Sequence, residues 1–382
     1  MPVRAELRLR DNPAVAARRL GILTFHRCIN YGSYWQARCL VEGLRAMGAD
    51  AVLLDHESPH AARAELRCAL SPILPQRTAR SDFTAYAEKT RKFHRAFARL
   101  PLSRRFPIDC PQEMEEYDAV IVGSDEVWNL RHPWYGGCST FYGVGIARPL
   151  ISYAASFGNH DASEGLSGDW AGRLGHFASL SVRDENSRRI VHAALGHDPA
   201  VVLDPCLQFP APAMRKRADG ERDRYVALYG HNFPGWFSAA ISRWAARQGL
   251  RIRSIGYRND WADEQWLSAG PADFAELMAG AEAVASNFFH GCVFALLNRR
   301  PFIAAPSAYR LNKVRDLLRG LGAERHMVLS EEDDRRIAQR LDGPPGAVVQ
   351  ARIRHLREQS GAFLRDALAA ASRKKSASVP AT

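Results

Sequence analysis

The sequence has no uninterrupted run of about 18 apolar residues, which is close to the shortest stretch that crosses a bilayer as a helix, and charges are scattered through its first 25 residues. Its seven cysteines are single and odd in number, and no C-x2-C pair offers the start of a zinc or redox site. No N-x-S/T sequon is present. These absences argue against a membrane span and against a secreted disulfide scaffold. We expect a cytoplasmic protein that is either soluble or held peripherally at the inner face of the membrane.

The motifs of several common enzyme classes are also missing. The chain has no Walker phosphate loop, no HExxH zinc motif and no G-x-S-x-G nucleophile elbow. The stretch "YGVGIARPL" has the first two glycines of a dinucleotide fingerprint but not the third. No cluster of Asp, Glu and His demands a metal ion. We therefore expect neither a metal nor a bound cofactor.

Length and hydropathy patterning predict two domains. With 382 residues, of which 46% are hydrophobic, the chain exceeds the size at which a single core usually stops growing. Short apolar runs alternate with helical patterns in both halves. We predict an α/β fold of two Rossmann-like, GT-B-like domains that face each other across a cleft. The predicted boundaries are 1–172 and 173–345 for the domains, 346–372 for a closing amphipathic helix and 373–382 for a disordered tail.

Basic charge is concentrated in a predicted helical insertion of the first domain, residues 60–107. The insertion has eleven basic and three acidic residues, within an overall formal charge of +11. Tyr86, Phe93, Phe97 and Leu100 recur at helical spacing, which indicates a buried stripe. The basic residues then form either a solvated face or a docking surface for an anionic acceptor or an anionic membrane.

Polar side chains follow two predicted strands of the first domain. "NYGSYWQA" separates an apolar run at 20–25 from a helix, and "GSDEVWN" follows a strand at 118–122. Ligands bind at this edge of open α/β sheets, where free N–H groups and short polar side chains meet. Ordinary helix caps, and a core position for the aromatic ring, are the alternative explanations. The candidate residues are Asn30, Tyr31, Gly32, Ser33, Gln36, Ser124, Asp125, Trp128 and Asn129.

Cationic side chains mark the second half of the chain. "SVRDENS" puts Arg183 after an apolar run at the entrance to the cleft, where it could grip a carboxylate or phosphate, or pair with Asp184 or Glu185. Arg310 and Lys313 in "YRLNKVRDLL" are further candidates for the same cleft.

A histidine lies between a predicted strand and a predicted helix in "AEAVASNFFHGCVFALLN". We expect His290 in the loop beside the helix N-terminus, with Asn287 and Gly291 around it. A phosphate or carboxylate gains there from unpaired N–H groups and the helix dipole, and an imidazole next to such an anion suits proton donation. The alternative is a partly buried histidine bonded to a backbone carbonyl. Asp204, before Pro205, is typical of a strand-ending turn.

Taken in order, these segments resemble the polysaccharide pyruvyl transferase family. "NYGSYWQA", "DAVIVGSDEVWN", "ISYAASFG", "SVRDENS", "LDPCL" and "SNFFHGCVFALLNRRPFI" follow one another as in that family, over residues 20–320. The resemblance implies transfer of the enolpyruvyl group of phosphoenolpyruvate to a sugar, with a pyruvate ketal and phosphate as products. Phosphoenolpyruvate would be the co-substrate, and a sugar or lipid-linked oligosaccharide the acceptor.

The resemblance also assigns roles. Arg183 and His290 fall on the family's donor-site arginine and histidine. Arg183 would then orient the donor, and His290 would either donate a proton to the methylene carbon or hold the phosphate. The resemblance does not assign the base that activates the sugar hydroxyl, for which Asp125 is the better-placed carboxylate. We group Asn287, Gly291, Arg310 and Lys313 with the donor, and the remaining residues of the two first-domain motifs with the acceptor.

Two other functions compete with this one. A GT-B nucleotide-sugar glycosyltransferase would usually place a carboxylate at the helix after His290, and none is present there. A non-catalytic basic binding protein would interleave exposed aromatics with its basic residues. The helical spacing of Phe93 and Phe97 indicates burial instead, so we expect no nucleic-acid partner.

Overall fold

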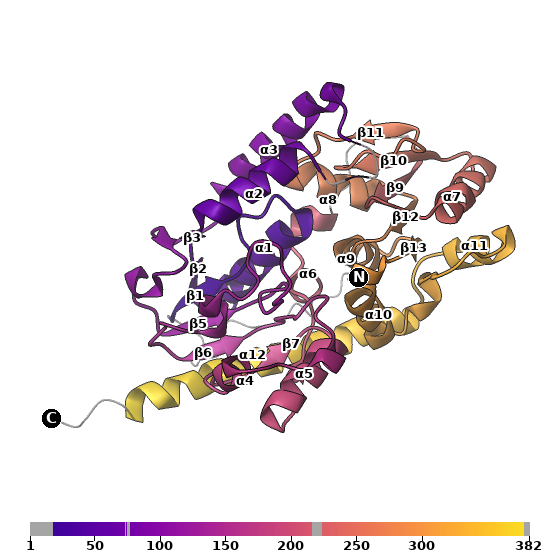
Figure 1. The fold of residues 1–382 in the computed structure, drawn as a ribbon. Helices are drawn as coiled ribbons and strands as arrows, with labels where there is room; N and C mark the ends of the chain where they lie inside the picture. The colour runs from indigo at the N-terminus through magenta and orange to yellow at the C-terminus, as the bar shows by residue number, and fades with distance from the viewer. Residues whose placement is uncertain (1–17, 73, 75–76, 216–223, 378–382) are drawn as a thin grey trace.

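The computed structural model describes residues 18–72, 74, 77–215 and 224–377. Its strands form two larger sheets, one in each half of the chain (Figure 1). Both sheets are parallel, as the βαβ patterning predicts. None of the helices in these residues combines the length and apolarity needed to cross a membrane.

The first sheet has the strand order β2-β1-β5-β6. Its central strand β5 is buried along its whole length, as expected for a parallel sheet with both faces covered. The elements of this half are β1 (Arg19–Leu23), α1 (Tyr31–Ala46), β2 (Asp50–Leu53), β3 (His56–Glu57), α2 (Pro59–Leu70), α3 (Phe83–Phe97), β4 (Phe106–Pro107), β5 (Ala119–Val122), β6 (Leu150–Ser152), α4 (Asp169–Leu174), β7 (Ser181–Val182), α5 (Glu185–Leu195), β8 (Ala200–Val201) and α6 (Pro205–Gln208).

The second sheet has the order β11-β10-β9-β12-β13 and begins at Tyr225. This start differs from the predicted boundary after residue 172. The short strand β7 pairs with β8 and is bridged to the β6 segment through Ile151 to Ser179 and Ala155 to Val182. Residues 179–201 therefore extend the first sheet.

The second half contains longer strands and the helices that flank them. Its elements are β9 (Tyr225–Tyr229), α7 (Gly235–Arg247), β10 (Arg251–Ile255), β11 (Glu264–Trp266), α8 (Pro271–Gly280), β12 (Ala283–Ser286), α9 (Phe289–Leu297), β13 (Phe302–Ala304), α10 (Ala308–Leu321), α11 (Asp334–Leu341) and α12 (Ala347–Ala377).

The two halves share one continuous core. Buried residues of β1 and α1 cluster with those of β9, α8 and α9. Trp35 of α1 is 1% exposed, and its indole N–H donates to Pro271 O at 3.0 Å. This contact fixes α1 against the second sheet's helices, so the predicted two-domain α/β architecture forms a single packed unit.

The basic insertion forms α2 and α3. Tyr86, Phe93, Phe97 and Leu100 are buried, which confirms the predicted stripe. The basic side chains are not all solvated, because Lys89 is 2% exposed and Lys92 pairs with Asp273 of the second domain at 2.6 Å. The insertion therefore reaches across the domain boundary.

The closing helix α12 runs back from the second half toward the first (Figure 1). Ser360 on this helix accepts a hydrogen bond from Leu203 N at 2.9 Å. The helix continues without a break at Gly361 and ends at Ala377, so residues 373–377 of the predicted tail are helical. Residues 378–382 lie outside the described part of the chain.

Candidate active site

A cavity of about 270 Å³ lies between the two domains at the carboxyl ends of both sheets. It brings together residues that follow β1, β5 and β7 in the first domain with residues of α9 and α10 in the second. Seven residues predicted from the sequence line it, namely Asn30, Ser33, Asp125, Arg183, His290, Arg310 and Lys313.

His290 lies in the first turn of α9, and the prediction that it belongs to the preceding loop is wrong. Phe288 is the last residue with extended φ and ψ, so the helix begins at Phe289. A Cβ added at Gly32 would lie 2.0 Å from His290 Nδ1, and one added at Gly291 would lie 2.0 Å from Ser286 Oγ. These two glycines let α1 approach the ring and α9 approach β12.

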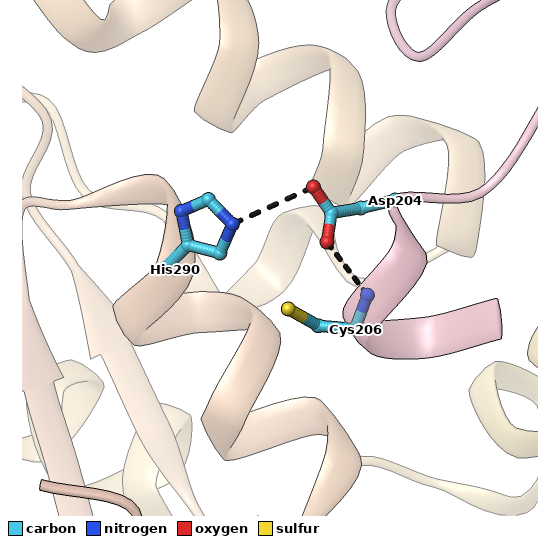
Figure 2. Close-up of side chains that lie close together, drawn as sticks. All are labelled: Asp204, Cys206 and His290. Carbon is cyan, nitrogen blue, oxygen red and sulfur yellow. Dashed lines mark hydrogen bonds and ion pairs between the residues drawn. The ribbon is translucent and has the colours of Figure 1, made fainter. Parts of the chain in front are cut away.

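Asp204 is a central group of the site, beyond its predicted role in a turn. Its Oδ2 lies 3.5 Å from His290 Nε2 and 3.2 Å from Arg183 Nη1. Its Oδ1 accepts a hydrogen bond from Cys206 N at 3.0 Å (Figure 2). Burial alone would raise the pKa of Asp204, but His290 and Arg183 bring it down to about 2. Asp204 is therefore an anion at neutral pH that orients both the His290 ring and the Arg183 guanidinium.

Asp204, Cys206 and His290 also bring three potential metal ligands together. One ligand atom from each lies within 4.8 Å of the others, and all three residues are buried (Figure 2). Burial raises the pKa of the Cys206 thiol well above its usual value, however, and Arg183 contacts the same Asp204 oxygen that faces His290. A protonated thiol and an adjacent guanidinium suit a metal ion poorly. We interpret the cluster as support for the imidazole.

Arg183 is held by two aspartates, and neither Asp184 nor Glu185 is its ion-pair partner. Its Nη2 lies 3.3 Å from Asp125 Oδ1, and its Nη1 contacts Asp204. Its guanidinium carbon lies 4.6 Å from the ring centroid of Phe289. The side chain is 2% exposed, so its charge is both buried and compensated.

Asp125 occupies a turn with a φ of 77° directly after β5. No helix follows it, so the alternative explanation for this motif, a helix cap formed by Ser124 or Asp125, is wrong. Asp125 Oδ1 accepts from Glu126 N at 2.9 Å, and Oδ2 accepts from the Ser33 hydroxyl at 2.7 Å. The carboxylate thus faces both Arg183 and a hydroxyl at the start of α1.

Asn30 is the N-cap of α1. This agrees with the alternative explanation given for its motif, an ordinary helix cap. Its side-chain oxygen accepts from Gly32 N at 2.8 Å and from Ser33 N at 3.2 Å. It also lines the cavity. Capping and cavity lining are therefore compatible at this position.

Lys313 of α10 pairs with Glu126, which follows Asp125 in the first domain. Burial would raise the pKa of Glu126, but Lys313 and then Arg183 lower it to about 2. The pair closes one side of the cavity between the domains.

Another part of the cavity wall is made by the helical insertion. Lys89 of α3 donates to Gly256 O at 2.9 Å, and burial lowers its pKa to about 8. Glu65 of α2 accepts from Ile29 N at 3.2 Å, and burial raises its pKa to about 7. Both side chains line the cavity, which therefore also holds ionisable groups of the insertion.

The sequence profile described as "Polysaccharide pyruvyl transferase" matches residues 30–307 of this chain. This chain belongs to the polysaccharide pyruvyl transferase family. The match covers the residues that form the cavity from Asn30 to His290, as the resemblance predicted. Comparison with curated protein sequences gave no match.

Solved structures similar to this chain have low sequence identity to it. UDP-GlcNAc 2-epimerase from Methanocaldococcus jannaschii is 12% identical over 90% of this chain and 99% of its own, with a TM-score of 0.46. UDP-GlcNAc 2-epimerase from Neisseria meningitidis is 10% identical over 91% and 93%, with a TM-score of 0.46. ADP-heptose LPS heptosyltransferase II from E. coli is 11% identical over 87% and 99%, with a TM-score of 0.37.

Several predicted site residues of the transferase do not line the cavity, because their side chains are used inside the fold. Trp128 is 0% exposed and donates to Phe141 O, so its predicted role in binding the acceptor is corrected to a core role. The Tyr31 hydroxyl donates to Ala269 O, and Gln36 donates to Thr24 Oγ1. The other residues outside the lining are Gly32, Ser124, Asn129, Asn287 and Gly291.

Three of these residues still support the cavity. Asn129 donates to Glu126, the partner of Lys313, at 2.9 Å. Asn287 donates to His231 O at 2.6 Å and holds the end of β9 beside α9. Gly32 sets the position of His290 as described above. The ionisable cavity residues that were not predicted from the sequence include Lys89, Glu65, Glu126, His231 and Tyr257.

Proposed function

We propose that this pyruvyl transferase moves the pyruvyl group of phosphoenolpyruvate onto two hydroxyls of a sugar, with a pyruvate ketal and phosphate as products. The observation that carries the proposal is the meeting of Arg183 and His290, from different domains, on the buried carboxylate of Asp204 beside one cavity. Family membership supports the same reaction class.

The proposed reaction needs an acid, a base and fixed cations. One acceptor hydroxyl oxygen bonds to the phosphate-bearing carbon of the donor while the methylene carbon gains a proton. The second hydroxyl oxygen then displaces phosphate, which leaves with the electron pair of its C–O bond. The two acceptor hydroxyls lose two protons in total. One is matched by the proton that the methylene carbon gains, and the other passes to phosphate or solvent.

His290 is the acid in this scheme. Its ring lines the cavity, and its Nε2 lies 3.5 Å from the anionic Asp204. A carboxylate at that distance orients the ring and offsets the positive charge that the ring carries when protonated. Arg183, fixed by two aspartates, orients the donor from the first domain.

Asp125 is the candidate base for the acceptor hydroxyl. The Ser33 hydroxyl donates to it at 2.7 Å, which supports the idea that a sugar hydroxyl can take a similar position. The acceptor would be a polysaccharide precursor or lipid-linked oligosaccharide. We place the reaction in the cytoplasm, with the basic α2–α3 region available to an anionic membrane surface and no cofactor besides the co-substrate.

The test of this function is turnover of phosphoenolpyruvate with its acceptor by the His290→Ala variant. Loss of a general acid should lower kcat about 10²- to 10⁴-fold. His192→Ala, at an exposed histidine of α5 that pairs with Asp198, is the matched control and should retain wild-type activity. Wild-type turnover by the His290 variant would remove this residue from the chemistry.

A thermal shift panel separates the competing functions. Phosphoenolpyruvate should raise the melting temperature of the wild-type protein, because a ligand of the native state stabilises it. Stabilisation by UDP-sugars alone would favour a nucleotide-sugar glycosyltransferase. Stabilisation by single-stranded DNA alone would favour a basic binding protein.

A further inference from the structure

The cationic side chains that line the cavity fall into two groups. Arg183 and Lys313 each have carboxylate partners, which are Asp125 and Asp204 for the former and Glu126 for the latter. Lys89 and Arg310 form no ion pair with any carboxylate of the described residues; their polar partners are a carbonyl, a hydroxyl and an imidazole. The charges of Arg183 and Lys313 are thus compensated within the protein, whereas those of Lys89 and Arg310 are available to pair with a ligand.

Lys89 is the more unusual of the two uncompensated cations. It is 2% exposed, and its ammonium lies 4.6 Å from the ring centroid of Tyr257 and 5.5 Å from that of Tyr31. One hydrogen bond to Gly256 O leaves two of the three N–H donors of an ammonium for another acceptor. Because an uncompensated charge is costly to bury, an anion in the cavity is the partner that this position favours.

Arg310 of α10, in the second domain, also lies beside an aromatic ring of the cavity wall. Its guanidinium carbon lies 4.3 Å from the ring centroid of Phe288, and its Nη2 lies 3.5 Å from His231 Nε2. The ring of His231 lies 5.0 Å from that of Tyr257, which Lys89 contacts. Burial, then Arg310 and Lys89, lower the pKa of His231 to about 4, so this histidine adds no charge of its own at neutral pH.

The carboxylate of Glu65 does not neutralise this end of the cavity. Glu65 lines the same space but forms no ion pair with Lys89 among the described residues, and its oxygen accepts from Ile29 N instead. The ammonium of Lys89 also lies within 5.7 Å of the ring centroids of Tyr31, Tyr86 and Tyr257. Two cations from different domains therefore line one cavity without a carboxylate partner among the described residues.

We propose that Lys89 and Arg310 together bind the phosphate of the donor, with α3 supplying Lys89 to a site that α10 supplies with Arg310. This inference rests on the proposed function. Two monocations match the double charge of a phosphate ester, whereas the charge of Arg183 is already offset by two aspartates. Lys89 is thus a donor-binding residue, and the helical insertion is part of the active site.

The test is isothermal titration calorimetry on the full-length protein, with phosphoenolpyruvate, inorganic phosphate and pyruvate as separate probes. Lys89→Met and Arg310→Met should each raise the Kd for phosphoenolpyruvate and for phosphate about 10- to 100-fold, which is the loss of one charge-assisted contact. The Kd for pyruvate should change by less than about threefold. Arg95→Met removes a cation of the same helix whose side chain is 68% exposed, and it should bind all three probes as the wild type does.

Melting curves without ligand separate binding from folding. Because the ammonium of Lys89 is buried, Lys89→Met should melt no lower than the wild type. Arg310→Met removes the second cation, which lies in the other domain. The site can therefore still be tested if one of the two variants fails to fold.

Unchanged phosphate affinity in both variants would overturn the inference, as would a wild-type protein that binds no phosphate. Loss of pyruvate binding with phosphate binding retained would also overturn it, because the cations would then hold the carboxylate. A wild-type protein that binds phosphate through Lys89 and Arg310 but binds no phosphoenolpyruvate would instead refute the proposed function and leave the anion site standing.

Discussion

Replacing Glu65 by glutamine should make the protein more stable at alkaline pH. The carboxyl group of Glu65 is 9% exposed and lies in the cavity wall beside Cys28 and Lys89. Burial raises its pKa from 4.5 to about 7, despite hydrogen bonds from Cys28 and Ile29 N and the charge of Lys89. Glutamine has nearly the same shape and keeps an oxygen for Ile29 N, but it never ionises.

The sign of the effect follows from proton linkage. Between pH 4.5 and about 7 the unfolded chain loses the Glu65 proton while the folded protein keeps it, so stability falls as pH rises through this window. The difference between the two pKa values corresponds to about 3 kcal/mol of folding free energy. The wild type carries this full penalty at pH 8 and almost none at pH 4.5.

The assay is urea unfolding followed by tryptophan fluorescence at several pH values from 5 to 8.5. Glu65→Gln should exceed the stability of the wild type by less than about 1 kcal/mol near pH 5 and by about 3 kcal/mol at pH 8. Glu88→Gln, at a side chain of α3 that pairs with Arg91, is the control for loss of a surface carboxylate. A Glu65→Gln protein that is less stable than the wild type at pH 8 would refute the reasoning, because the carboxylate would then stabilise Lys89 as an ion.

Three further substitutions test the site. Gly32→Ala should lower kcat at least about tenfold without unfolding the protein, because the new methyl group would meet His290 Nδ1 at 2.0 Å and displace the ring. Steady-state kinetics measure the loss of kcat, and a melting curve shows whether the variant is folded. Lys313→Met should lower the free energy of unfolding by about 3 kcal/mol, since it leaves a buried carboxylate unpaired, and adding Glu126→Gln should recover most of the loss in urea titrations. Asp125→Asn should lower kcat about 100-fold as expected for a general base, and an unchanged kcat would remove Asp125 from that role.

The α/β fold could be predicted from the sequence because strands of a parallel sheet with both faces covered by helices appear as continuous apolar runs. The segments "AVIV" and "AVAS" became β5 and β12 for this reason. The predicted boundary at 172 differs from the start of the second sheet because β7 and β8 have two residues each. Their pairing with the first sheet depends on contacts between distant segments, which no local pattern encodes.

The candidate site could be predicted where position along a strand decides it. Asp125, Arg183 and His290 follow strands or begin a helix at the carboxyl edges of the sheets, so topology alone brings them together. Trp128 could not be placed in the same way, since an aromatic ring beside a polar turn fits both a core and a ligand wall.

Lys89 and Glu65 were not predictable because their environment is created by the packing of two domains. In the sequence, Lys89 is one cation among eleven in a basic stretch. Its burial depends on the approach of Gly256 and Tyr257 from the second domain. Helical periodicity identified the apolar stripe of α3 but gave no sign that a charged residue beside it is also covered.

The most direct test of the central claim is the reaction of the wild-type protein in D₂O with phosphoenolpyruvate and the sugar or lipid-linked oligosaccharide fraction of its source cell. We predict an acid-labile pyruvate ketal whose methyl group carries one deuterium, formed together with an equal amount of phosphate. A product that keeps the vinyl methylene group, or transfer of sugar from a nucleotide donor with phosphoenolpyruvate left intact, would contradict it.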